Sequence, residues 1–164
     1  MTTNNKKLST TWKFIIAIFI CQAVGIVSGL LTRNETATWF TTLQKPSWNP
    51  PAYLFGPVWT TLYLLMGISL ALVWKSDAPE TQKLRAELTF ALQLFLNFMW
   101  SILFFSCHSP ALAFVDIVLM IVTILMTIGR FARISKWAAW LLIPYLAWVC
   151  FASVLNYNIW MMNA

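Results

Sequence analysis

Amide and carboxyl side chains interrupt the apolar segments of this sequence at a few positions, and these positions hold the groups most capable of chemistry. Gln93 and Asn97 stand four residues apart, and Trp100 and Phe104 continue the same face of a helix. Asp116 stands in the next apolar segment. A polar side chain that faces lipid is costly, so such residues usually face the interior of a helical bundle and often mark a binding site.

Two further segments repeat aromatic and small or amide side chains at intervals of four residues, which places each set on one helix face. The positions are Phe55, Trp59 and Tyr63 in one segment, and Trp148, Ala152 and Asn156 in the other. Ligand pockets combine apolar and aromatic walls with a few polar groups, so these residues together predict a ligand-binding pocket. The alternative is that the amides and the carboxyl only join helices through hydrogen bonds, each worth about 1 kcal/mol.

The sequence lacks the groups that most enzyme classes need. It has no nucleophile paired with a base, no glycine-rich phosphate loop and no metal-ligand cluster. Cys21, Cys107 and Cys150 stand far apart, and His108 is the only histidine. Hydrolase, kinase and metalloenzyme functions are therefore not predicted. A disulfide framework and a metal site are not predicted either, and no cofactor is expected to be required.

The composition predicts that the candidate residues lie in membrane-spanning helices. Of 164 residues, 60% are hydrophobic and 10% are charged, whereas soluble domains carry about 25% charged residues. A helix of about twenty apolar residues crosses a bilayer. We therefore predict an all-α integral membrane protein, a single domain over residues 1–164 that forms one bundle of five transmembrane helices. The predicted spans are 12–31, 54–74, 85–106, 111–131 and 137–160.

The distribution of basic residues predicts the orientation in the membrane. The N-terminus and the second and fourth connections hold nine of them: Lys6, Lys7, Lys13, Lys75, Lys83, Arg85, Arg130, Arg133 and Lys136. The other side holds only Arg33 and Lys45. Because cytoplasmic loops carry an excess of Lys and Arg, we expect the N-terminus in the cytoplasm and the C-terminus outside. The net charge of +6 then reflects topology and contact with membrane lipid, and nucleic acid is not an expected partner.

The first connection, residues 32–53, is about twenty residues long, which is more than a link between helices needs. It contains Pro46, Trp48 and two further prolines. The direction of each helix places the candidate residues in the half of the membrane under this connection, with Gln93 near the middle. We therefore expect the connection to act as a lid over the pocket.

Two further features concern helix packing. Cys21, Gly25 and Gly29 form a pattern of small residues that permits close approach of helices, either within the bundle or between subunits. Pro144 falls inside the fifth span, where the loss of a backbone hydrogen bond is expected to kink the helix.

Several segments carry a wider pattern: LQKPSWNPP at 43–51, VWT at 58–60, LFLN at 94–97, PYLAW at 144–148 and FASVLNY at 151–157, together with Trp100 and Asp116. These segments resemble the translocator protein family, also called the tryptophan-rich sensory proteins. The resemblance covers nearly the whole chain.

This resemblance implies a five-helix bundle, commonly a homodimer, that binds hydrophobic small molecules beneath the first loop. The ligands implied are porphyrins such as protoporphyrin IX, steroids and benzodiazepine-like drugs. By similarity, Trp59, Asn97, Trp148 and Ala152 would line the pocket, with Pro46 and Trp48 in its roof. Some members are reported to degrade protoporphyrin in light, a reaction associated with the two tryptophans that Trp59 and Trp148 match.

The C-terminus departs from the animal members of this family. Those proteins follow the Asn-Tyr segment with a basic residue that completes a proposed cholesterol motif, whereas residues 158–164 contain no Lys or Arg. This difference argues against cholesterol transport and favours a bacterial cell membrane.

Three functional hypotheses follow. The first is a receptor-like or transporter-like protein that binds porphyrins and acts either in the sensing of tetrapyrroles or stress or in transport. The second is an enzyme that degrades protoporphyrin IX with light and oxygen, with Trp59 and Trp148 as its catalytic residues. The third is a structural membrane protein whose pocket is incidental.

Overall fold

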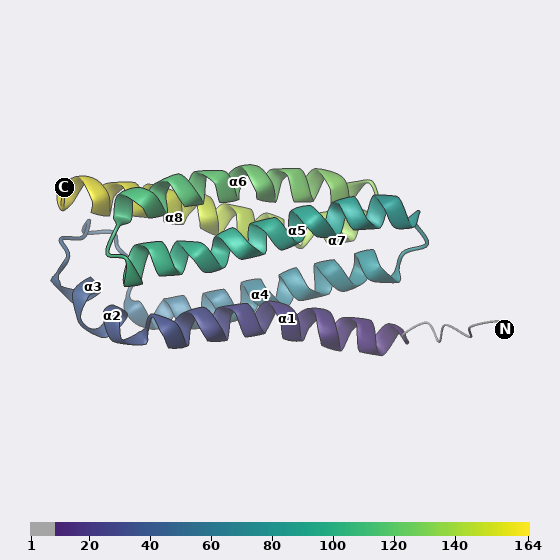
Figure 1. Ribbon diagram of the computed structural model, residues 1–164, viewed down its shortest axis with the longest axis horizontal. Coiled ribbons are helices and arrows are strands. Elements are labelled where there is room, and N and C mark those ends of the chain that lie inside the picture. The colour runs from purple at the N-terminus through teal and green to yellow at the C-terminus, as the bar shows by residue number, and fades with distance from the viewer. Residues whose placement is uncertain (1–8) are drawn as a thin grey trace.

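The computed structural model describes residues 9–164, which form a bundle of helices (Figure 1). Within this part of the chain, five helical segments are long and apolar enough to cross a membrane, and no strand occurs among the described residues. The spans are α1 (Thr10–Leu31), α4 (Ala52–Lys75), α5 (Glu80–Ser101) with η1 (Ile102–Ser106), α6 (Pro110–Ala132), and α7 (Lys136–Trp140) with α8 (Ile143–Met162). The predicted fold class, an all-α membrane protein with five transmembrane helices, is confirmed.

The observed span boundaries lie close to the predicted ones. The largest difference is at the start of α5, which begins at Glu80 rather than at residue 85. Glu80 and Lys83 form an ion pair of 2.6 Å one turn apart, and such pairs stabilise a helix outside its apolar part. Hydropathy therefore locates the part of this helix that is apolar, but not the polar turn that precedes it.

The fifth span consists of two helices rather than one kinked helix. Leu141 and Leu142 separate α7 from α8, and Pro144 lies in the first turn of α8. The missing N–H of a proline costs least in a first turn, because the N–H groups there have no helical partner. The N–H of Leu146 still donates to the carbonyl of Leu142 at 3.0 Å. The predicted kink at Pro144 is thus a break that precedes the proline.

The third span ends in a π-helical turn, η1. The N–H of Cys107 donates to the carbonyl of Ile102 at 2.9 Å, five residues back rather than the four of an α-helix. Phe104, inside this turn, is only 2% exposed. Its ring stacks on Trp100 with the two ring centroids 5.1 Å apart, so the turn presents an aromatic surface to the bundle interior.

Glycine residues allow α1 and α4 to pack closely. A Cβ atom added at Gly67 would lie 2.5 Å from the Cα of Ile18, and one added at Gly25 would lie 2.3 Å from Cε2 of Tyr63. Side chains in a packed interior leave no room for such contacts. Gly25 therefore serves helix packing within the chain, whereas the space around Gly29 is open.

Residues 32–53 contain two short helices and a turn rather than one irregular loop. The helices are α2 (Arg33–Ala37) and α3 (Trp39–Thr42), and they lie at the end of the bundle that also holds the C-terminus, opposite the start of α1 (Figure 1). We call this the loop end. Gln44 and Asn163 exchange two hydrogen bonds of 2.9 Å, which fix the segment to the end of α8.

Candidate ligand-binding site

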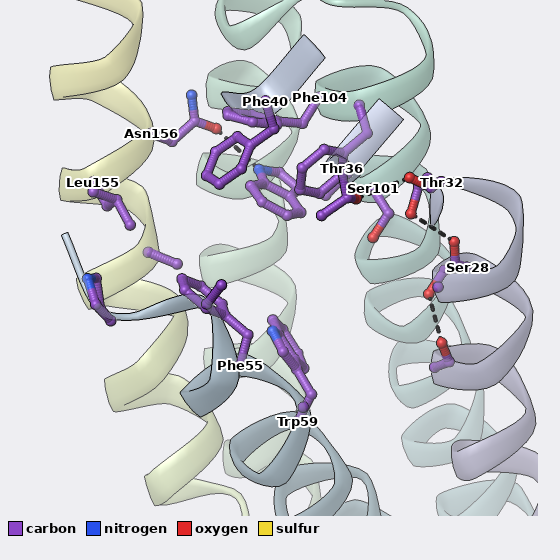
Figure 2. A pocket seen from close by; sticks show the side chains of 18 of the residues that line it. Ser28, Thr32, Thr36, Phe40, Phe55, Trp59, Ser101, Phe104, Leu155 and Asn156 are labelled. Carbon is purple, nitrogen blue, oxygen red and sulfur yellow. Dashed lines mark hydrogen bonds between the residues drawn. The ribbon is translucent and has the colours of Figure 1, made fainter. Parts of the chain in front are cut away.

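A cavity of about 610 Å³ lies at the loop end, between α1, α4, α5 and α8 and against the segment that carries α2 and α3 (Figure 2). Small-molecule sites in proteins have volumes of about 300–1,000 Å³. Helix α6 contributes none of the described lining residues. The cavity is therefore large enough for a small organic ligand.

The structure brings eight of the twelve predicted site residues together at this cavity. They are Phe55, Trp59, Tyr63, Asn97, Trp100, Trp148, Ala152 and Asn156. In Figure 2, Phe55 and Trp59 project from α4, and Leu155 and Asn156 project from α8 across the cavity. Binding of a ligand by these residues remains a prediction.

Pro46 and Trp48, the predicted roof residues, do not line the cavity. The carbonyl of Pro46 accepts a hydrogen bond of 2.9 Å from the N–H of Asn49, which closes a turn. Trp48, in this turn, is 45% exposed and packs edge-on against Phe151, with the ring centroids 5.8 Å apart. Asn49 and Pro50 line the cavity instead. No periodic pattern applies within a turn, so the sequence could not show which of its residues face inward.

Gln93 and Asp116 are buried but lie outside the cavity lining. Gln93 is 1% exposed on α5, and Asp116 is 6% exposed on α6. Neither the Gln93 amide atoms nor Oδ2 of Asp116 has a hydrogen-bond partner among the described residues. Helical periodicity therefore predicts the buried face of each helix. It does not show whether that face lines a cavity or packs against another helix.

A hydrogen-bonded cluster closes the cavity at the end away from the loop segment. The hydroxyl of Tyr63 donates to Oδ1 of Asn97, and Nδ2 of Asn97 donates to the hydroxyl of Tyr145 at 3.2 Å. The hydroxyl of Tyr145 in turn donates to Sδ of Met120 at 3.4 Å. Asn97 thus joins helices, as the alternative interpretation required, and also borders the cavity. The sequence analysis missed Tyr145, because no local spacing links it to Asn97.

The polar atoms of Asn156 are also engaged within the bundle. Its Oδ1 accepts from Nε1 of Trp100 at 2.9 Å, and its Nδ2 donates to the carbonyl of Pro110 at 2.8 Å. The indole N–H of Trp148, in contrast, is buried without a partner among the described residues. A buried unpaired donor costs about 1–3 kcal/mol. An acceptor group of a bound ligand could therefore pair with the indole N–H of Trp148.

Aromatic rings form much of the cavity wall. Phe55 and Trp148 pack edge to face with their ring centroids 5.9 Å apart, and Trp59 lies 5.5 Å from Tyr63 by the same measure. Aromatic pairs of this kind favour offset or edge-on geometry and expose ring faces to neighbouring groups. The wall suits a flat, apolar ligand.

Lys45 is the charged side chain among the described lining residues. Its Nζ lies 3.3 Å from the carbonyl of Leu43 and 4.4 Å from the ring centroid of Phe40. No carboxylate pairs with it among the described residues. Among its described lining residues, the cavity therefore combines aromatic walls with the positive charge of Lys45 at the loop end.

His108 joins α2 and α3 to the connection between η1 and α6. Its Nε2 lies 2.8 Å from Oε2 of Glu35, and its ring stacks on Trp39 with the centroids 4.4 Å apart. Its φ of 50° lies in the left-handed region, which costs a non-glycine residue about 1–3 kcal/mol. These contacts have no local signal in the sequence, because Glu35 is 73 positions away from His108.

Residues 17–161, a range that contains all twelve predicted site residues, match the TspO/MBR family. The chain belongs to this family. Among its TspO/MBR relatives, the tryptophan-rich protein TspO of Chlorobaculum tepidum is 44% identical over 97% of this chain and 99% of its own length. The tryptophan-rich protein TspO of Archaeoglobus fulgidus is 40% identical over 93% and 97% of the two chains. The human translocator protein is 36% identical over 95% and 94%.

Membership of the TspO/MBR family confirms the resemblance noted in the sequence. Together with the five apolar helices, it identifies an integral, multi-pass membrane protein. It also supports a receptor- or transporter-like role in the membrane.

Proposed function

We propose that this TspO/MBR protein binds porphyrins, in particular protoporphyrin IX. Binding would serve the sensing of tetrapyrroles or of stress, or the transport of tetrapyrroles. The observation that carries the proposal is a cavity with aromatic walls and, at its loop end, the Lys45 ammonium, which pairs with no carboxylate among the described residues. A flat aromatic macrocycle can stack on rings such as those of Trp59 and Trp148. The two carboxylates of protoporphyrin IX are acceptors for the Lys45 ammonium.

Other hydrophobic molecules belong to the same proposal, including steroids and benzodiazepine-like drugs. A neutral steroid would contact the aromatic walls but would make no ion pair with Lys45. We therefore expect Lys45 to distinguish acidic from neutral ligands of similar size.

A titration of the purified protein in lipid nanodiscs tests this proposal. Protoporphyrin IX is added in the dark, and binding is followed by its absorption spectrum and by quenching of tryptophan fluorescence. We expect saturable binding that weakens at least tenfold in Lys45→Met, since a charged hydrogen bond contributes about 1.5–3 kcal/mol. Protoporphyrin IX dimethyl ester, which has no carboxylate, is the matched ligand, and its affinity should not change in Lys45→Met. Absence of saturable binding to the unmodified protein would contradict the proposal.

Degradation of protoporphyrin IX by light and oxygen is the second candidate function. The observation that favours it is that Trp59 and Trp148, on different helices, line the same cavity. An indole close to an excited porphyrin can act as an electron donor without the catalytic groups that other enzymes need. No cofactor is required in either proposal.

The orientation and assembly of the chain also remain proposals. We propose a cytoplasmic N-terminus in a bacterial cell membrane, from the basic residues of the sequence, of which Lys6 and Lys7 lie outside the described residues. We also propose a homodimer, as the resemblance implies.

Cysteine labelling in intact cells tests the orientation. Thr41→Cys and Asp77→Cys are placed singly in a background with Cys21, Cys107 and Cys150 replaced, since Thr41 and Asp77 are both exposed and lie at opposite ends of the bundle. A membrane-impermeant maleimide should label only Thr41→Cys. Labelling of Asp77→Cys alone would reverse the proposed orientation, and labelling of both would contradict a membrane crossing by α4, the span between the two positions.

A further inference from the structure

The cavity wall is least covered where α1 meets α4. Most lining residues in the spans are buried or half-buried, but four are exposed: Ile26 and Gly29 on α1, and Ala52 and Gly56 on α4. Helices α5 and α8 contribute no exposed residue to the lining. A residue that lines the cavity and is also exposed on the outer surface marks a place where little or no protein separates the cavity from that surface.

Glycine leaves this place open. A Cβ atom added at Gly29 or at Gly56 would meet nothing within 4 Å. Closer to the middle of the bundle the same two helices are in tight contact, because a Cβ at Gly25 would collide with the ring of Tyr63. The α1–α4 boundary is therefore closed at mid-bundle and open near the loop end.

A hydrogen bond marks the closed part of this boundary. Nε2 of Gln22 donates to the carbonyl of Thr60 at 2.9 Å, which links α1 to α4 one turn below Gly56. Gln22 also lines the cavity, so it both joins the two helices and borders the pocket.

Between the other spans the cavity is covered by side chains, whereas Thr36 and Thr41 of the loop segment line the cavity and are exposed to the water side. Phe55 and Trp148 pack together between α4 and α8. Ser28 and Thr32, which line the cavity from α1, are buried. At the loop end, the His108 contacts with Glu35 and Trp39 hold α2 and α3 over the cavity.

We infer that the α1–α4 boundary around Gly29 and Gly56 is a lateral portal, through which ligands pass between the bilayer and the cavity. This inference rests on the proposed function, in that the cavity takes up a ligand. Gly29 is two residues from the end of α1 and Gly56 four residues from the start of α4, so the portal lies about 3–6 Å below these helix ends. The ligands it admits are amphiphiles dissolved in the leaflet at the loop end, with an apolar body among the acyl chains and a polar group near the level of Lys45.

Access to a cysteine inside the cavity tests the portal without any natural ligand. Ala152→Cys, on the α8 wall, is placed in a background with Cys21, Cys107 and Cys150 replaced, and the protein is reconstituted in vesicles that contain pyrene maleimide, an apolar thiol reagent. Gly29→Leu and Gly56→Leu, alone and together, should slow this reaction at least fivefold, because leucine fills the opening. Gly129→Leu is the matched control, since Gly129 is also exposed with open space around it but lies on α6, outside the cavity lining. It should leave the rate unchanged.

An equal reaction rate in the leucine variants and the control would overturn the portal, and so would an Ala152→Cys protein that does not react with pyrene maleimide. Stopped-flow binding of protoporphyrin IX separates this inference from the proposed function. A blocked portal slows association and release together and leaves Kd within twofold, whereas a leucine that merely occupies ligand space raises Kd and does not slow release. If protoporphyrin IX fails to bind the unmodified protein, the proposed function is wrong, and the thiol reaction still decides the portal.

Discussion

Gly67→Ala is expected to lower the free energy of unfolding by about 3 kcal/mol, the upper part of the range for overpacked cores. The added Cβ would lie 2.5 Å from the Cα and 2.9 Å from the N of Ile18. Both are backbone atoms, so no side-chain rotation can relieve the contact, and α1 must move away from α4. The thermal unfolding midpoint of the protein in detergent micelles, followed by circular dichroism, measures the loss.

Gly129→Ala is the control for this substitution. It makes the same chemical change in a membrane helix, but a Cβ at Gly129 meets nothing within 4 Å. Alanine forms helix better than glycine by about 1 kcal/mol, so this variant should be unchanged or slightly stabilised. Equal midpoints for the two variants would show that the close contact of α1 and α4 does not contribute to stability.

Trp148→Phe is expected to reduce light-driven loss of protoporphyrin IX at least tenfold, if the indole supplies the electron, while affinity falls less than about fivefold. Phenylalanine keeps an aromatic ring in the wall but removes the more easily oxidised indole and its N–H. One neutral hydrogen bond contributes about 1 kcal/mol, which sets the limit on the loss of affinity. Trp59→Phe should behave in the same way. The two measurements are the decay of porphyrin absorption under illumination and binding in the dark.

Trp137→Phe provides the control, because Trp137 is 76% exposed and lies outside the cavity. Loss of photodegradation with binding retained supports the enzyme hypothesis. Parallel loss of both indicates a binding pocket without specific indole chemistry. If neither property changes in Trp59→Phe or Trp148→Phe, the assignment of these residues to the site is wrong.

The local pattern of the sequence predicts the helices and much of the cavity wall, because both depend on spacing within one helix. Phe55, Trp59 and Tyr63 are one turn apart on α4, and all three line the cavity. Contacts between segments that are distant in the sequence produce no such regular spacing. Tyr145 and Gly67 are examples, since each is defined by a partner on another helix.

The same limit explains the residues that do not reach the cavity. The cost of a polar group in lipid predicts that Gln93 and Asp116 are buried, and both are. Whether a buried face meets a cavity or another helix depends on how five helices are arranged around one another. In the connection at 32–53, turns replace periodicity, so the inward position of Asn49 and the outward position of Trp48 had no signal in the sequence.

The π-helical turn η1 also has a consequence for how relatives of this chain should be aligned. A π turn contains one residue more than the α turn it replaces, so the segment Ile102–Ser106 carries an insertion within a membrane span. The insertion lets two consecutive residues, Phe104 and Phe105, both face the cavity. A relative that keeps an uninterrupted α-helix here would need one residue fewer between Trp100 and Pro110 to hold the same faces inward. An alignment gap inside this span would then mark a change of helix type at the cavity wall, and not a difference in loop length.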